Sequence, residues 1–138
     1  AEMKDIVNRK IKFREPFRPF APSICIDAVS SHFELKNPEK HQPCRYMLYV
    51  VPITVDTIPA VKHQDGTGRL QAVERSVNPR YYDLIKKKGD VSGTPVVLNT
   101  SFNLKGEPIV TTPQNAFSTF SRCEMDMLVM QNAIVYKA

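Results

Sequence analysis

The chain has 138 residues, enough for one domain and too few for two of ordinary size. Its 42% hydrophobic and 24% charged residues are typical of a globular protein and exclude a disordered or collagen-like chain. The net charge of +5 favours anionic ligands without being diagnostic of nucleic acid.

The first half of the chain predicts two helices separated by an extended basic segment. Residues 2–10 are expected to form a short helix. Closely spaced prolines exclude a regular helix between residues 10 and 23 and leave an extended, ordered loop. A second helix is expected over residues 23–35, followed by a polar turn at residues 37–43.

The second half alternates strands and helices. We expect a buried strand over 46–55, a short strand over 69–73, a central strand over 95–99 and closing strands over 127–130 and 133–136. Helices are expected from Asn78-Pro79 to a cap at Gly89, and from Thr112-Pro113 to about Cys123. The interleaving predicts a mixed α/β fold in one domain, residues 1–138.

The sequence lacks membrane-spanning, secretory and paired-cysteine patterns, and these absences bear on the expected location and metal content. No apolar run is long enough to span a bilayer, and the charged start has no apolar stretch of the kind that makes a secretory signal. The cysteines Cys25, Cys44 and Cys123 show no C-x-x-C spacing, so we predict neither a disulfide framework nor a metal site. We therefore expect a cytoplasmic protein without a membrane partner.

Basic and aromatic residues alternate from Lys10 to Ser23. If Ile11 and Phe13 face the core of an extended segment, Lys10, Lys12 and Arg14 lie side by side on the opposite face. Such like charges repel unless an anion lies between them, and guanidinium groups suit phosphate or carboxylate. A solvated basic edge strand is the alternative, which the residues alone favour.

A second group of polar residues lies around an Asp-Gly pair. Its two glycines allow a ligand close to the backbone, and its donors and acceptors are His63, Asp65, Thr67 and Arg69. One histidine and one carboxylate are too few for a metal site, and no phosphate-binding motif is present. A hairpin loop with an Asp-Gly turn explains the spacing equally well.

A third group follows the expected strand over residues 95–99. Asn99-Thr-Ser-Phe-Asn103 holds four polar side chains where ligands bind in α/β proteins, at the carboxyl end of a central strand. Ser101 lacks the G-x-S-x-G surroundings of an acyl nucleophile. A polar turn that caps its own backbone is the alternative, although the position favours binding.

Residues 10–23, 59–71 and 94–103 together resemble the hallmark segments of one domain, the C-terminal domain of the O-carbamoyltransferases that act on antibiotics and nodulation factors. The resemblance spans the chain in order. It implies a YrdC-like fold, a twisted mixed sheet flanked by helices, as in threonylcarbamoyl-AMP synthases. Those synthases carry Lys-x-Arg and Ser-x-Asn pairs around their nucleotide, which Lys12-Phe13-Arg14 and Ser101-Phe102-Asn103 match.

The resemblance implies a division of labour in a longer enzyme. This domain would bind carbamoyl phosphate and ATP, with Mg²⁺ on the ATP, and form carbamoyl-adenylate. An N-terminal Kae1-like domain with its own metal site would then transfer the carbamoyl group to an acceptor hydroxyl. The present sequence has neither that domain nor the family's Gly-Pro-Arg-Ala-Leu-Gly segment, so we interpret it as an excised C-terminal fragment.

Site roles follow from the resemblance together with the charges. We expect charge stabilisation from Lys12, Arg14 and Arg69 as catalytic residues. Substrate binding is assigned to Arg18, Ser23, His63, Asp65, Thr67, Asn99, Ser101 and Asn103, with His63 and Asp65 holding the substrate or a magnesium-bound triphosphate. We predict that Ser101 and Asn103 share one concave pocket with Lys12, Arg14 and Arg69.

A second function class is a non-catalytic nucleic-acid-binding module with a basic concave face. Interleaved Arg and Phe side chains suit phosphate contacts and base stacking. The modest charge and the clustering of cations with polar loop residues argue against it. Binding of a mononucleotide in preference to an oligonucleotide would separate the two functions.

Overall fold

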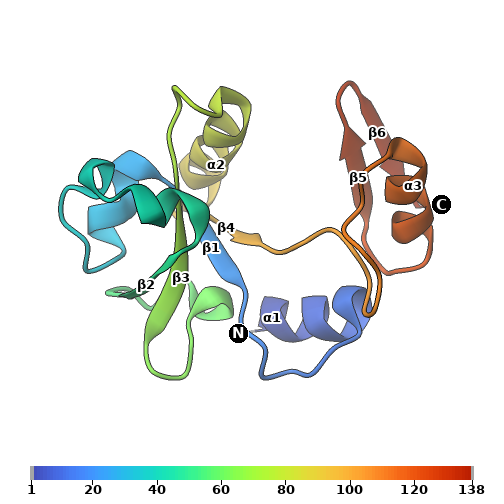
Figure 1. Cartoon of the computed structure of the whole chain (residues 1–138), viewed down its shortest axis with the longest axis horizontal. Coiled ribbons are helices and arrows are strands. Elements are labelled where there is room, and N and C mark those ends of the chain that lie inside the picture. The colour runs from blue at the N-terminus through green and yellow to red at the C-terminus, as the bar shows by residue number, and fades with distance from the viewer. Residues whose placement is uncertain (1, 138) are drawn as a thin grey trace. The chain divides into compact units, whose positions relative to one another are not determined.

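The computed structural model describes residues 2–137, which divide into two compact units. The terminal unit combines the residues up to Arg18 with those from Ser101 onward, and the central unit runs from Pro19 to Thr100. Each unit contains both helices and strands, and the strands form a four-stranded mixed sheet and a separate two-stranded sheet (Figure 1). The expected mixed α/β class is therefore confirmed.

The central unit is built on the four-stranded sheet, in the order β2-β3-β1-β4. Strand β1 pairs in parallel with β3, and the β1–β4 and β2–β3 pairs are antiparallel. The strand bounds are β1 Ala21–Cys25, β2 Tyr49–Pro52, β3 Thr67–Val73 and β4 Val96–Asn99.

Strand β1 corrects the helix expected over residues 23–35. Ser23 and Ile24 belong to this strand, all of whose residues are buried. Only a 3-10 helix follows, η2 (Ile26–Ser31). All residues of β1 are buried, so its sequence shows no alternation between polar and apolar residues that would identify a strand.

The two outer strands correct two further expectations. Strand β2 was expected to be buried, but it lies at one edge of the sheet with Tyr49 and Val50 exposed and only Val51 buried. Strand β4 lies at the other edge, although we expected it at the centre. The unforeseen strand β1 takes the inner position that the sequence had assigned to β4.

The sheet separates two cores. On one face, Ile53 and Phe33 lie so close to Gly68 that an added Cβ would meet Ile53 Cδ1 at 2.8 Å and Phe33 Cε1 at 3.5 Å. On the other face, Cys25 and Val73 pack against Ile85 of helix α2 (Pro79–Ser92). The polar turn expected over residues 37–43 is occupied by two short 3-10 helices, η3 (Pro38–Lys40) and η4 (Gln42–Tyr46). A further 3-10 helix, η5 (Pro59–Val61), precedes β3.

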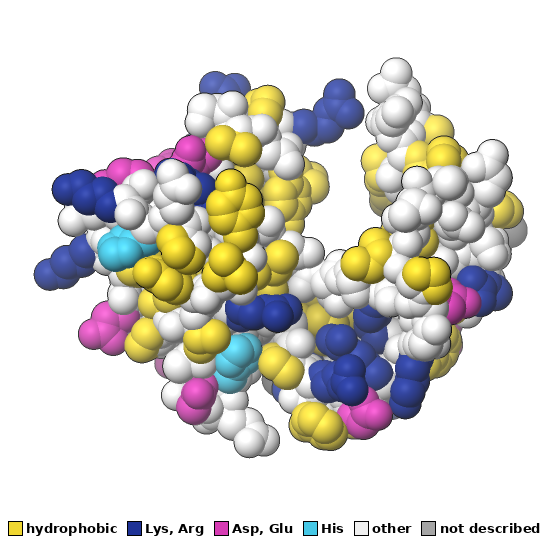
Figure 2. Space-filling view, viewed as in Figure 1, with side chains coloured by type: hydrophobic (Ala, Val, Ile, Leu, Met, Phe, Trp, Pro, Cys, Tyr) yellow, Lys and Arg dark blue, Asp and Glu magenta, His cyan; other side chains and the backbone are white. Residues whose placement is uncertain are grey.

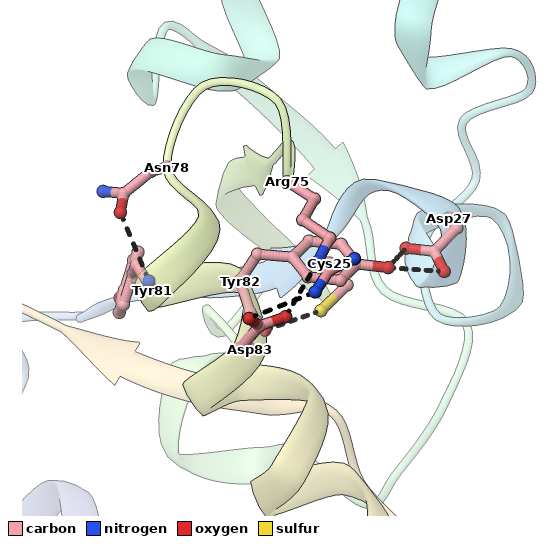
Figure 3. Close-up of polar contacts among 7 residues, drawn as sticks. All are labelled: Cys25, Asp27, Arg75, Asn78, Tyr81, Tyr82 and Asp83. Carbon is pink, nitrogen blue, oxygen red and sulfur yellow. Dashed lines mark hydrogen bonds and ion pairs between the residues drawn. The ribbon is translucent and has the colours of Figure 1, made fainter.

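Polar contacts hold the first turns of α2 against the segment after β1 (Figure 3). The Tyr82 hydroxyl donates to both carboxylate oxygens of Asp27 at 2.9 Å, and Cys25 Sγ donates to the Tyr82 carbonyl at 3.5 Å. Burial and the neighbouring Asp27 raise the pKa of Tyr82 to about 12, so the phenol stays protonated and keeps donating at neutral pH. Asn78 caps the helix by accepting from the Tyr81 amide at 3.2 Å.

Helix α2 runs past the expected cap at Gly89 and ends at Ser92, where Gly93 with φ 72° provides the left-handed cap. Gly89 instead serves close packing. A Cβ at Gly89 would lie 2.7 Å from Pro95 Cβ and 2.9 Å from Pro95 Cα, just before β4 begins.

We therefore expect Gly89→Ala to destabilise the protein, although this change ordinarily favours a helix by about 1 kcal/mol. Overpacking against the Pro95 backbone should lower the free energy of unfolding by about 1–3 kcal/mol, measured by urea denaturation. The control is Asp90→Ala at the next, exposed position, which should be neutral or slightly stabilising. A gain in stability from Gly89→Ala would show that Pro95 does not pack there.

The terminal unit contains both ends of the described chain. Helix α1 (Glu2–Ile6) continues as a π-helical segment, η1 (Val7–Lys12), two residues beyond the expected end. Helix α3 (Pro113–Ser121), capped by Thr112, packs on the antiparallel hairpin of β5 (Met127–Met130) and β6 (Ala133–Tyr136). Their core is Ala116, Phe120 and Leu128. These three expected elements are confirmed.

Two expected absences concern membranes and disulfides. Among residues 2–137, no helix combines the length and the apolar character needed to cross a bilayer. Cys25, Cys44 and Cys123 are all buried free thiols. Burial raises the pKa of the Cys25 and Cys44 thiols, which keeps them protonated and unreactive near neutral pH.

Candidate functional site

Lys12 is the centre of a polar cluster in the terminal unit. Its side chain is buried, with 4% of the residue surface exposed, and Nζ donates to oxygen atoms of two residues. The distances are 2.8 Å to the Ser101 carbonyl, 2.8 Å to the Asn103 carbonyl, 2.7 Å to Asn103 Oδ1 and 3.3 Å to Ser101 Oγ. Lys12 therefore converges with Ser101 and Asn103, whereas a concave pocket that these three residues share with Arg14 stays a prediction.

The helical conformation of η1 brings Lys12 inward. The sequence predicts an extended segment with Lys12 and Arg14 on one face, and a solvated edge strand is the alternative. Both interpretations are wrong in conformation, because residues 7–12 are helical and the chain turns sharply at Phe13, which has φ 48°. A bulky residue rarely adopts this left-handed conformation, which marks Phe13 as a strained position next to Lys12.

The segment from Ser101 to Glu107 also bonds to itself. Ser101 Oγ donates to Asn103 Oδ1 at 2.7 Å, and Asn103 Nδ2 donates to the Glu107 carbonyl at 2.7 Å. Phe102 packs against the α3–hairpin core and anchors the segment. The alternative of a polar turn thus describes part of the geometry, but the turn is closed around the Lys12 ammonium. Ser101 remains exposed, whereas Asn103 is half-buried.

Arg14 and Arg18 extend the positive charge away from Lys12. Arg14 Nε donates to Asn8 Oδ1 at 2.8 Å, and the half-buried Arg14 lines a cavity of about 550 Å³ with Asp5, Asn8, Arg9, Phe13 and Pro16. Arg18 is exposed and forms an ion pair with Glu15 at 3.0 Å. Figure 2 shows Lys and Arg side chains gathered in the lower part of the view, over the region of α1 and η1.

The electrostatics of this cluster favour an anion. Burial, and then the charge of Arg14, hold the pKa of Lys12 below its usual range. Burial and the charge of Arg18 likewise lower the pKa of Arg14, against the smaller opposite effect of Glu15. A bound anion would oppose these shifts, because it replaces lost hydration and offsets the like-charge repulsion.

A second polar group lies on the sheet of the central unit. Gln71 Oε1 accepts from Ser23 Oγ at 2.5 Å and from Asn99 Nδ2 at 2.7 Å. The register pairs Ser23 with Gln71 and Ala21 with Asn99, so these side chains share one face of the sheet. Alternation along β3 places Thr67 and the exposed Arg69 on the same face. Three predicted substrate-binding residues, Ser23, Thr67 and Asn99, thus lie on one face of the sheet with Arg69, which was predicted to be catalytic.

The loop before β3 is closed by its own side chains. Asp65 Oδ1 accepts from the Thr67 amide at 3.0 Å and from Thr67 Oγ1 at 2.7 Å, which lowers the pKa of Asp65. His63 Nδ1 lies 3.1 Å from Thr67 Oγ1, and Gly66 has φ 82°. The Asp-Gly turn that we considered as the alternative is therefore present, and the predicted ligand contacts of His63 and Asp65 stay predictions.

The predicted pocket also included Arg69. Arg69 belongs to the central unit, whereas Lys12 and Arg14 belong to the terminal unit. Its grouping with them therefore stays a prediction.

Comparison with known proteins decides the family. A family model described as "Carbamoyltransferase C-terminus" matches residues 1–137. The chain belongs to this carbamoyltransferase family. The expected resemblance is thereby confirmed, and the chain is a carbamoyltransferase-family domain.

Relatives of this carbamoyltransferase domain include nodulation proteins. Over 99% of the chain it is 39% identical to nodulation protein NolNO of Sinorhizobium fredii and 40% identical to nodulation protein NolO of Bradyrhizobium diazoefficiens, covering 20% and 25% of their lengths. An uncharacterized protein of Synechocystis is 39% identical over 98% of the chain and 25% of its own length. The chain thus spans a fifth to a quarter of these relatives.

Sequence reasoning missed two residues of the carbamoyltransferase domain that organise these polar groups. Asn8 lies in the N-terminal helical segment and accepts a hydrogen bond from Arg14. Its burial could not be predicted, because the sequence shows only an amide next to the apolar Val7. Gln71 joins Ser23 and Asn99. Its position between the buried Leu70 and Ala72 was a usable signal, because a side-chain amide on an inner strand usually has a hydrogen-bond partner.

Proposed function

We propose that this chain binds carbamoyl phosphate and ATP and forms carbamoyl-adenylate, as the C-terminal part of a longer carbamoyltransferase. An N-terminal Kae1-like domain would transfer the carbamoyl group to an acceptor hydroxyl. Family membership supports the transferase class. The observation that carries the adenylate step is the buried Lys12 ammonium, held against Ser101 and Asn103 with Arg14 nearby in sequence.

The chemistry proposed needs positive charge and positioning. Hydrolysis of carbamoyl phosphate gives carbamate and releases inorganic phosphate. Attack of a carbamate oxygen on the α-phosphorus of ATP then gives carbamoyl-adenylate and releases pyrophosphate. Negative charge accumulates on the phosphate oxygens in both steps, so fixed cations lower the barrier and no covalent enzyme intermediate is required.

The terminal unit divides this work between its residues. Lys12 already binds four oxygen atoms, so its contribution is a fixed positive charge and the positioning of Ser101 and Asn103. Ser101 is exposed, and its hydroxyl would contact a phosphate oxygen. Arg14 supplies a guanidinium at the wall of the 550 Å³ cavity, where it would bind phosphate in a bidentate manner.

Magnesium enters this proposal only as part of the ATP substrate. Within the described residues, no three His, Cys, Asp or Glu side chains lie together in a way that could hold a metal ion. Asp65, which we expected near a magnesium-bound triphosphate, is engaged by Thr67.

Arg14→Lys tests the proposed phosphate contact. An ammonium keeps the charge but loses the planar fork, so ATP and carbamoyl phosphate should bind more weakly by about 1–3 kcal/mol in isothermal titration calorimetry. Arg75→Lys, at an exposed arginine paired with Asp83, is the control and should leave both affinities unchanged. Equal affinity of the Arg14 variant and the unchanged protein would contradict the contact. Tighter binding of a single-stranded oligonucleotide than of ATP would favour a nucleic-acid-binding module instead.

A further inference from the structure

Asn8 is a fully engaged polar residue inside the terminal unit. Only 1% of its surface is exposed. Its side chain accepts from Arg14 Nε at 2.8 Å through Oδ1 and donates through Nδ2 to the carbonyls of Pro16 and Arg18, both at 3.3 Å. A buried amide is costly unless its donors and acceptors have partners, and here both ends of the amide are used.

These contacts tie the loop from Phe13 to Arg18 back onto the helix that precedes it. The Asn8 carbonyl accepts from the Phe13 and Arg14 amides, the latter at 3.1 Å, where the chain leaves η1 in a left-handed conformation. The Asn8 side chain then reaches the far part of the same loop through Pro16 and Arg18. One residue thus holds the beginning and the end of the segment that carries two of the arginines.

The contact between Asn8 and Arg14 also fixes the orientation of the guanidinium group. A guanidinium is planar, so a hydrogen bond at Nε sets the orientation of the whole group, including the two Nη atoms that form bidentate pairs with phosphate. Asn8 and Arg14 both line the 550 Å³ cavity. A flexible arginine would lose side-chain entropy on binding a phosphate there, and a preoriented one loses less.

We propose that Asn8 is a positioning residue that orients the Arg14 guanidinium toward a ligand phosphate in this cavity. The proposal rests on the proposed function, because it requires a phosphate-bearing substrate at Arg14. Asn8 acts through Arg14 and touches no reacting atom itself. An aspartate at this position could accept from Arg14 Nε but could not donate to the loop carbonyls, and its charge would compete with the phosphate.

The test is calorimetric titration of the 138-residue chain with ATP. Asn8→Ala should weaken ATP binding on the order of tenfold, equivalent to about 1.4 kcal/mol. Asn132→Ala, at an exposed asparagine between β5 and β6, is the matched control and should have no effect. If Asn8→Ala does not fold, Asn8→Leu replaces it, because leucine has a similar volume and also lacks an acceptor for Arg14 Nε, and the same loss of affinity is expected.

A double-mutant cycle separates positioning from a purely structural role. In an Arg14→Ala background, Asn8→Ala should cause no further loss of ATP affinity, because the group that it orients is gone. A structural role predicts the same loss in both backgrounds and would overturn the proposal. Unchanged ATP affinity of folded Asn8→Ala would also overturn it while leaving the proposed function intact. Absence of ATP binding by the unsubstituted chain would overturn both.

Discussion

Replacing Lys12 by methionine is expected to destabilise the protein strongly and to abolish adenylate formation. Methionine fills a similar volume but has no proton to donate. The oxygens of Ser101 and Asn103 that accept from Nζ would therefore lose their hydrogen-bond donor beside the buried side chain of residue 12. Each buried polar group left without a partner costs about 1–3 kcal/mol, and the combined loss should be about 3 kcal/mol or more.

Thermal denaturation checks the structural part of this prediction. The matched control is Lys10→Met, two residues earlier, where the lysine is half-exposed and paired with Glu124 at the surface. Removing such a pair should change stability by less than about 1 kcal/mol. If the two variants lose the same stability, Lys12 does not hold the segment from Ser101 to Asn103.

Release of pyrophosphate from ATP in the presence of carbamoyl phosphate checks the functional part. Lys12→Arg keeps the positive charge, but a planar fork cannot reproduce the arrangement of four oxygens around one nitrogen. We expect this variant to fold more stably than Lys12→Met and to remain strongly impaired in pyrophosphate release. Full activity of Lys12→Arg would show that charge alone, without the positioning of Ser101 and Asn103, is sufficient.

The elements that the sequence predicted well are those whose signals are local. Thr112-Pro113 marks the start of α3 because a threonine cap and a proline in the first turn act within a few residues. The strands β5 and β6 were placed at their observed bounds, since short apolar runs flank a polar turn. Local chemistry also explains the turn at Gly66, which needs a positive φ.

The elements that it predicted poorly depend on partners far along the chain. Strand β1 lies between β3 and β4, whose residues are about 50 and 75 positions away in the register, for example Ser23 with Gln71 and with Val97. Burial on both faces removes the alternation that identifies a strand, so residues 23–35 were assigned to a helix. The edge positions of β2 and β4 follow from the same long-range pairing.

The candidate site shows the same difference between local signals, which can be read from the sequence, and long-range contacts, which cannot. The residue types and their pairing in motifs identified Lys12, Ser101 and Asn103, which do converge. The sequence did not predict how they converge, because the inward direction of Lys12 depends on where the π-helical segment ends. Hydrogen-bonding roles such as that of Asn8 depend on carbonyl groups brought near by the loop, and these have no residue-specific signal.

The variants Ser101→Ala and Asn103→Ala are expected to differ in their loss of stability and to show a similar loss of activity. The substrate-binding roles that we expect for both residues imply that each alanine variant loses activity with little loss of stability. The structure changes this for Asn103, whose amide accepts from Lys12 and Ser101 and donates to the Glu107 carbonyl. Asn103→Ala should therefore lower the free energy of unfolding by about 2–3 kcal/mol, whereas Ser101→Ala, at an exposed position, should change it by less than about 0.5 kcal/mol.

Pyrophosphate release should fall in both variants, by about tenfold or more if each side chain contributes one hydrogen bond of about 1.4 kcal/mol or stronger to the transition state. The control is Ser121→Ala on α3, an exposed serine whose hydroxyl donates to the Phe117 carbonyl in its own helix. Ser101→Ala is the decisive variant, because it isolates the hydroxyl from the scaffold. Loss of activity with unchanged melting temperature places that hydroxyl on the substrate, and unchanged activity would reduce the segment around Asn103 to a turn that Lys12 stabilises.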